Sequence, residues 1–159
     1  MQLAPISSVR SAVAPRAAWL PATVLFESAM RLDTVEPDVL VSTFSVPTAR
    51  NATYARAEVR HNVWRNGTKV DAEVLRGVAH ARERQLAAAV ADALRGSRFL
   101  ADARPIQAGA ALPIGSVRIT AIEADGTRRA VTMAGDSVPS SYAAFDTAID
   151  AYLTAVIPQ

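Results

Sequence analysis

The chain has 159 residues, half of them hydrophobic, which suits a single domain with a buried core and excludes a disordered tail. Its 17 basic and 15 acidic residues leave a net charge of only +2, so charge alone does not indicate nonspecific binding to nucleic acid. With no cysteine and two histidines, His61 and His80, the sequence excludes a disulfide framework and a histidine-rich metal site.

Residues 1–21 are rich in proline and alanine and contain no acid, and we expect an extended arm that packs on a neighbouring subunit. Arg10 and Arg16 before an apolar run also suggest a cleaved leader, but Pro21 interrupts the run and Glu27 ends it. No segment approaches the roughly 20 uninterrupted apolar residues that are needed to span a bilayer.

Two strands are predicted after the arm, over residues 22–32 and 39–46, because both segments are rich in β-forming residues. Pro37 lies in the turn between them, and Pro47 ends the second strand.

Residues 54–74 predict a β-hairpin, because Asn66-Gly67 suits a two-residue type I′ turn. The expected register pairs Trp64 with Lys69, Val63 with Val70, Asn62 with Asp71, Arg60 with Glu73, and Val59 with Val74. Alternation then puts one mainly polar set on a shared face, namely Arg56, Glu58, Arg60, Asn62, Trp64, Lys69, Asp71 and Glu73. The opposite face receives Ala57, Val59, His61, Val63, Val70, Ala72 and Val74.

A helix is predicted over residues 79–96, with Leu86, Val90 and Leu94 on one side and Gly96 at its end. Residues 97–103 predict one or two further helical turns, and residues 105–115 predict a linker.

A second hairpin is expected around Asp125-Gly126. A three-residue turn aligns Val117, Ile119 and Ala121 with Val131 and Met133, and Glu123 with Arg129. The last helix is expected over residues 140–157, with an apolar face made of Tyr142, Phe145, Ile149, Leu153 and Val156. This order of elements predicts an α+β fold with an antiparallel β-sheet and helices packed on one face.

The sequence gives no positive sign of an enzyme. His61 alternates into an apolar strand face, and His80 has no adjacent nucleophile motif, so both are interpreted as structural. Asp146 and Asp150 lie one helical turn apart, a spacing that suits a metal or an acid–base pair but is more typical of a solvated helix face.

The polar face of the first hairpin has two interpretations. It is either an ordinary water-facing sheet surface with cross-strand ion pairs, or a platform on which cations meet phosphates while Trp64 meets bases. Three acids on the same face disfavour nonspecific binding and favour selective contact.

The segment VEPDVLVSTFSVPTARNATYARAEVRHNV resembles the central strands of coat proteins from single-stranded RNA bacteriophages (leviviruses). The following segment, VDAEVLRGVAHARERQLAAAVADALRGSRFLADA, is similar to their last strand and two helices. The resemblance covers roughly residues 22–104 and rests on a pattern rather than on an invariant signature.

The resemblance implies an intertwined homodimer in which the helices of one subunit cover the sheet of the other. It further implies an icosahedral virion shell assembled in the host cytoplasm, which encloses genomic RNA and represses replicase translation by binding an RNA hairpin. It implies no cofactor, metal, small-molecule substrate or membrane partner. The implied RNA-facing residues are Thr43, Ser45, Arg56, Glu58, Arg60, Lys69, Asp71 and Glu73. Lys69 and Asp71 stand where the best-known relatives have a stacking tyrosine and an asparagine, so Trp64 is a substitute stacking platform.

The chain departs from the family pattern in three places. It begins with an arm, and the hairpin-like segment follows the helices, as in a circular permutation. The short Asn66-Gly67 turn replaces a longer loop that contacts neighbours in relatives, and the helix over 140–157 has no clear counterpart. We therefore expect one coat-protein domain over 1–159, made of the arm (1–21), the sheet and helices (22–104) and the permuted hairpin with the last helix (105–159).

Two rival functions remain open on sequence alone. The first is an exported, non-enzymatic α+β binding module whose arm is a processed leader. The second is a small hydrolase that uses His61 or His80.

Overall fold

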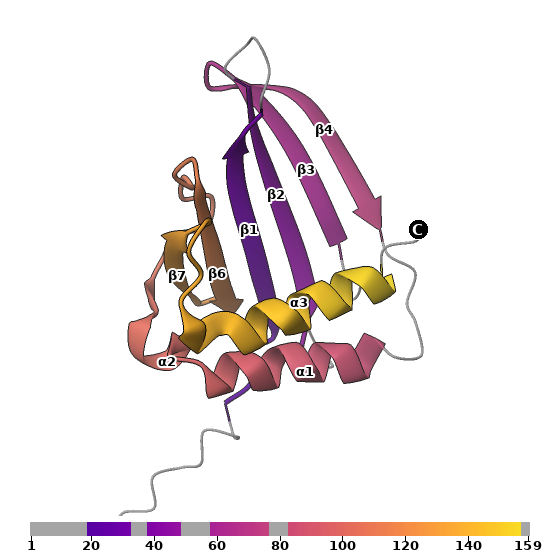
Figure 1. Ribbon diagram of the computed structural model, residues 1–159, viewed down its shortest axis with the longest axis vertical. Coiled ribbons are helices and arrows are strands. Elements are labelled where there is room, and N and C mark those ends of the chain that lie inside the picture. Colours follow the sequence, from indigo (N-terminus) through magenta and orange to yellow (C-terminus); the bar gives the residue numbers. More distant parts are fainter. Residues whose placement is uncertain (1–18, 33–37, 49–57, 77–82, 157–159) are drawn as a thin grey trace, which may run out of the picture.

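The computed structural model describes residues 19–32, 38–48, 58–76 and 83–156. These residues form one antiparallel sheet of seven strands in the order β4-β3-β2-β1-β6-β7-β5 (Figure 1). The strands are β1 (Thr23–Arg31), β2 (Asp38–Pro47), β3 (Glu58–Arg65), β4 (Thr68–Arg76), β5 (Arg104–Pro105), β6 (Ser116–Ile122) and β7 (Arg128–Ala134). The helices are α1 (Glu83–Gly96), α2 (Phe99–Asp102), the short 3-10 helix η2 (Ser140–Tyr142) and α3 (Ala143–Val156).

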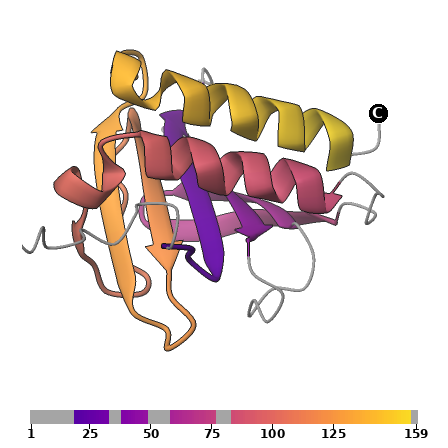
Figure 2. The ribbon, with the colours of Figure 1, turned by 90° about the horizontal axis from the view of Figure 1, so that it is seen from below.

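The α+β class and the antiparallel sheet with helices on one face are confirmed. Figure 2 shows α1 and α3 side by side on the same side of the sheet. In Figure 1 both helices run across the lower ends of the strands, while the upper parts of β1 to β4 extend beyond them. One sheet joins strands from both sides of the predicted boundary at residue 104.

The core lies between the lower half of the sheet and the two long helices. The sheet contributes Val24, Val46, Ile119 and Ala121, and the helices contribute Val90, Leu94, Phe145, Ile149 and Tyr152. Because side chains alternate along a strand, this core identifies the face of each strand that points toward the helices. The sequence pattern missed Tyr152, which is buried, whereas Leu153 on the predicted face is only partly buried.

The Asn66-Gly67 turn is confirmed, but the hairpin register predicted beyond it is wrong. Asn66 and Gly67 have φ of 50° and 77°, and Trp64 pairs with Lys69 as expected. Val70 is then an extra residue, a β-bulge, so that Val63 pairs with Asp71 instead of Val70. The same shift pairs Asn62 with Ala72, Arg60 with Val74, Val59 with Leu75, and His61 with Glu73.

The second hairpin has the expected three-residue turn, in which the Glu123 N–H donates to the Thr127 carbonyl over 2.9 Å. Val117 pairs with Met133 and Ile119 with Val131, as predicted. The expected pairing of Glu123 with Arg129 is wrong, because Arg129 pairs with Ala121.

The end of the predicted arm is part of the described fold. Trp19 stacks on Phe99 with ring centroids 5.9 Å apart, and its indole N–H donates to Glu123 over 2.9 Å. Residues 1–18 lie outside the described part, as does His80. No helix in the described ranges is long and apolar enough to cross a membrane.

Candidate nucleic-acid interface

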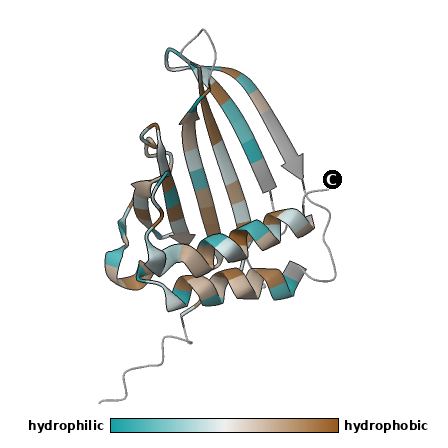
Figure 3. Cartoon of the chain, in the orientation of Figure 1, coloured by the Kyte–Doolittle hydropathy of each residue, from teal (hydrophilic) through white to brown (hydrophobic). Residues whose placement is uncertain are grey.

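The sheet has a second face that points away from α1 and α3, which we call the helix-free face. The register places on it Glu27, Arg31, Val39, Val41, Thr43, Ser45, Arg60, Asn62, Trp64, Lys69 and Arg118. Figure 3 shows that β3 is more hydrophilic than its neighbour β2. By this register, the helix-free face contains most of the residues for which the resemblance implies RNA contact.

The nominated residues differ in exposure. Arg60, Trp64 and Lys69 are exposed, and Thr43 is half-buried. Ser45 is buried, and its hydroxyl has no hydrogen-bond partner among the described residues. Arg56 lies outside the described residues, and Glu58 is located only through its pairing with Ser45 and Arg76.

The bulge at Val70 moves acidic positions away from the helix-free face. Asp71 was expected beside Asn62 but pairs with Val63, so it belongs to the face that points toward the helices. Glu73 likewise pairs with His61. The placement of these two residues with Arg60 and Lys69 was wrong, and the surface around Trp64 is consequently less acidic than the sequence suggested.

A groove of about 830 Å³ lies on the helix-free face, between the upper strands and the loop at 107–115. Val39 and Val41 from β2 and Asn62 and Trp64 from β3 line its strand side. Arg31 also lines it, as do Glu27 and Arg118. The loop side is formed by Gly109, Ala110, Ala111, Leu112 and Ile114.

A buried arginine fixes that loop to the sheet. Arg118 donates from Nε to Glu27 Oε2 over 2.7 Å, and from its two terminal nitrogens to the carbonyls of Ala110 and Ala111 over 2.9 and 3.2 Å. The Gly115 N–H also donates to the Ala29 carbonyl over 2.7 Å, and Gly115 has a φ of 81° that suits glycine. The groove wall is therefore held by both charge and backbone contacts.

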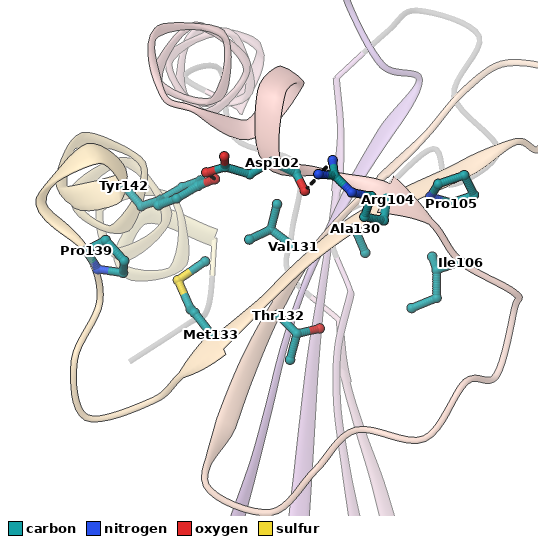
Figure 4. A pocket seen from close by; sticks show the side chains of 10 residues that line it. All are labelled: Asp102, Arg104, Pro105, Ile106, Ala130, Val131, Thr132, Met133, Pro139 and Tyr142. Carbon is teal, nitrogen blue, oxygen red and sulfur yellow. Dashed lines mark hydrogen bonds between the residues drawn. The ribbon is translucent and has the colours of Figure 1, made fainter.

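A second hollow, of about 540 Å³, lies at the outer edge of β7 (Figure 4). There the Tyr142 hydroxyl donates to Asp102 Oδ2 over 2.9 Å. Burial, the hydrogen bond to Asp102 and the charge of Asp102 together raise the pKa of Tyr142 well above its usual value. Tyr142 is therefore a neutral hydrogen-bond donor at physiological pH, and its contact with Asp102 ties η2 to α2.

Three other residues that the sequence analysis singled out, His61, Asp146 and Asp150, lie within the described ranges. His61 Nδ1 lies 3.0 Å from the Ser42 hydroxyl, a contact that satisfies a half-buried histidine. Asp146 is half-buried and Asp150 is exposed, and no cluster of three or more potential metal ligands occurs among the described residues.

The groove itself was missed by the sequence interpretation, which treated residues 105–115 as a linker. Two signals pointed to it: Glu27 within the apolar run of β1, and Arg118 within the otherwise uncharged β6. A lone charge inside a buried strand requires a partner. Finding the partner requires the pairing of β1 with β6, which the sequence does not specify.

Comparisons with known proteins returned no match to a family model, a curated protein or a solved structure.

Proposed function

We propose that this chain is the coat protein of a single-stranded RNA bacteriophage, which assembles as dimers into an icosahedral shell and binds genomic RNA on the helix-free face. The resemblance of residues 22–104 to levivirus coat proteins motivates the proposal. Two features of the described fold support it. The edge strand β4 pairs on one side only among the described strands, and part of the apolar sheet surface is not covered by the helices.

The observation that carries the proposal is the edge strand β4. It contains nine residues, and β3 is its one partner among the described strands. A long edge strand exposes a row of N–H and C=O groups that invites pairing with another chain. A second copy of β4 satisfies these groups.

The face of the sheet that points toward the helices is also incompletely covered, because some of its apolar side chains remain exposed to solvent. Met30 is 50% exposed, and Leu40 and Val63 are only partly buried, although all three lie on the face that α1 and α3 cover lower down. We call this set the uncovered patch. Met30 and Leu40 pair where β1 ends and β2 begins, and Figure 1 shows these strand ends in the upper part of the sheet, beyond the chain's own helices.

A single two-fold axis brings a second copy of the chain against both the edge of β4 and the uncovered patch. Antiparallel pairing of β4 with its copy, about a two-fold axis perpendicular to the sheet, keeps both pairs of helices on one side and inverts one subunit end to end. The helices of each subunit, which extend across the strands as far as β4 in Figure 1, then approach the upper strands of the other. This is the intertwined arrangement that the resemblance implies.

The opposite face suits an RNA backbone. Arg31, Arg60 and Lys69 are exposed there, and the carboxylate of Glu27 is neutralised by Arg118. Phosphate contacts by arginine and lysine supply most of the affinity for nucleic acid and make it sensitive to salt. In a closed shell this face lies inside, against the genome. Before the shell closes, binding of an RNA hairpin to the same face represses translation of the replicase.

Electron microscopy of the purified chain, combined with nuclease treatment, tests the proposal. We expect closed particles that protect RNA. Lys69→Ala should lower the RNA content and its sensitivity to salt while particles still form, and Arg84→Ala on the exposed side of α1 should change neither. A monomer that carries no RNA contradicts the proposal.

A further inference from the structure

We propose that the hollow at the outer edge of β7 binds an extended peptide segment of a partner protein, which adds to the sheet as a further strand. The segment has an acidic side chain between two apolar ones. This inference goes beyond the proposed function, because the hollow lies on the other side of the sheet from β4 and contains none of the residues assigned to RNA.

The outer edge of β7 is only partly paired. The two residues of β5 pair with Arg129 and Ala130. Just below them, the Ile106 N–H donates to the Arg128 carbonyl over 3.2 Å. Because main-chain groups alternate in direction along a strand, the N–H and C=O of Thr132 point outward, like the carbonyl of Arg128. No described residue hydrogen-bonds to them, and Thr132 is exposed, so β7 offers one free donor and one free acceptor at the hollow.

The hollow extends around this edge to both faces of the strand. Val131 and Met133 line it on the helix side, together with Pro139 and Tyr142, whereas Thr132 lines it on the opposite face. Figure 4 shows Met133 pointing toward Tyr142 and Pro139, and Thr132 pointing away from them. An added residue that pairs with Thr132 places its side chain on the Thr132 side. The residues before and after it therefore meet the apolar surface around Met133.

Arg104 supplies a cation on the Thr132 side of the hollow. It pairs with the β7 residue two positions before Thr132, so alternation puts it on the same face. One of its terminal nitrogens donates to the carbonyls of Ala101, Asp102 and Ala103, each over 3.1 Å. These contacts hold the guanidinium at the end of α2 and leave Nε and the other terminal nitrogen without a partner in the described part of the chain. A guanidinium held in this way suits a carboxylate, which accepts two parallel hydrogen bonds.

The acid at the hollow is already neutralised. Asp102 Oδ2 accepts from the Tyr142 hydroxyl over 2.9 Å, and Oδ1 lies 3.5 Å from Nε of Arg98. Figure 4 shows this carboxylate turned toward Tyr142 and away from Arg104. Arg104 is therefore the uncompensated charge among the described lining residues, and it favours an acidic over a basic side chain beside Thr132.

The test measures binding of the peptide fluorescein-Thr-Val-Glu-Val-Thr-amide to the full chain by fluorescence anisotropy. Two altered peptides separate the contacts. Methylation of the glutamate main-chain nitrogen removes the donor for the Thr132 carbonyl and should weaken binding by roughly 5-fold or more. Replacement of the glutamate by lysine should weaken binding by roughly 10-fold or more.

A charge exchange tests the role of Arg104 through a gain as well as a loss. Arg104→Glu should bind the glutamate peptide roughly 10-fold more weakly, and the lysine peptide more tightly, than the unmodified chain does. Arg84→Glu makes the same charge change at an exposed position on α1 and should bind both peptides as the unmodified chain does. Thermal denaturation shows whether each variant is folded, and the two altered peptides keep the test decisive if Arg104→Glu is not.

Each adverse outcome contradicts the inference in its own way. Equal binding of the N-methylated peptide would show that no strand is added, and equal binding of the lysine peptide would show that Arg104 does not select an acid. If no peptide binds while Arg104→Glu shifts sedimentation toward monomer, the edge of β7 pairs with a second copy and the inference is wrong. None of these results bears on RNA content, which Lys69→Ala tests separately.

Discussion

Glu27 and Arg118 form an ion pair across the junction of β1 and β6, with a distance of 2.7 Å between Oε2 and Nε. The two side chains are only 16% and 7% exposed, although they lie 91 positions apart in the sequence. This contact joins the first strand to the hairpin that follows the helices. Arg118 also donates hydrogen bonds to the carbonyls of Ala110 and Ala111, and so it holds in place the loop that forms one wall of the groove.

Arg118→Met should lower the free energy of unfolding by about 3 kcal/mol, because it leaves Glu27 largely buried without its partner and frees two carbonyls. The double variant Glu27→Gln with Arg118→Met should lose less than the two single variants added together, since no buried charge remains. Urea denaturation of the full set measures this coupling. Arg84→Ala, at an exposed position, should stay within about 0.5 kcal/mol of the unmodified chain. Additive losses would show that the pair is not a coupled unit.

The register of the β3–β4 hairpin predicts which engineered disulfide forms. The chain contains no cysteine, so a designed pair has no competing thiol. Val63→Cys with Asp71→Cys should oxidise readily because these residues are cross-strand partners, whereas Val63→Cys with Val70→Cys should not. Titration of free thiols after mild oxidation measures both. If the Val63–Val70 cysteine pair oxidised more readily than the Val63–Asp71 pair, the hairpin would have the register without a bulge, and Asp71 would lie on the helix-free face.

The sequence predicted the local elements well because each has a local cause. Strand β2 ends at Pro47, helix α1 ends at Gly96, and the chain reverses at Asn66-Gly67. Each of these effects comes from the residue's own backbone preference and does not depend on tertiary packing. The bulge at Val70 had no such signal, since alternation continues through VDAEV as it does in a regular strand. The placement of Asp71 and the partnership of Glu27 with Arg118 depend on strand pairing, and so the sequence interpretation missed both.

Tyr142 predicts a loss of stability at high pH. Burial and Asp102 raise the pKa of Tyr142 in the folded protein above the unfolded value of about 10. The folded state therefore holds the proton more tightly, and the resulting stability is complete below pH ~10 and is lost as pH rises toward the folded pKa. Denaturation between neutral pH and pH ~11 should show this decline.

Tyr142→Phe should flatten that decline and should cost about 1.5 kcal/mol at neutral pH, where the hydrogen bond to Asp102 is lost. An equally steep decline in the variant would assign the pH dependence to other groups.

The uncovered patch predicts a variant that blocks association without harming the fold. Met30→Asp places a charge where the helices of a second copy are proposed to pack, and Met30 is half exposed in the single chain. We expect the folded variant to dimerise at least tenfold more weakly, because a buried unpaired charge is costly. Ile114→Asp, at an equally exposed apolar position in the loop on the helix-free side, is the control and should associate normally. Equal association of both variants would remove the patch from the interface.

Sedimentation velocity of the unmodified chain tests the central claim most directly, since we propose that a second copy pairs with the open β4 edge and covers the uncovered patch. We predict dimers and larger closed assemblies with little monomer, and a shift toward monomer for Met30→Asp. A single monomeric species across the concentration range, with a fold as stable as that of an ordinary domain of this size, would contradict the account.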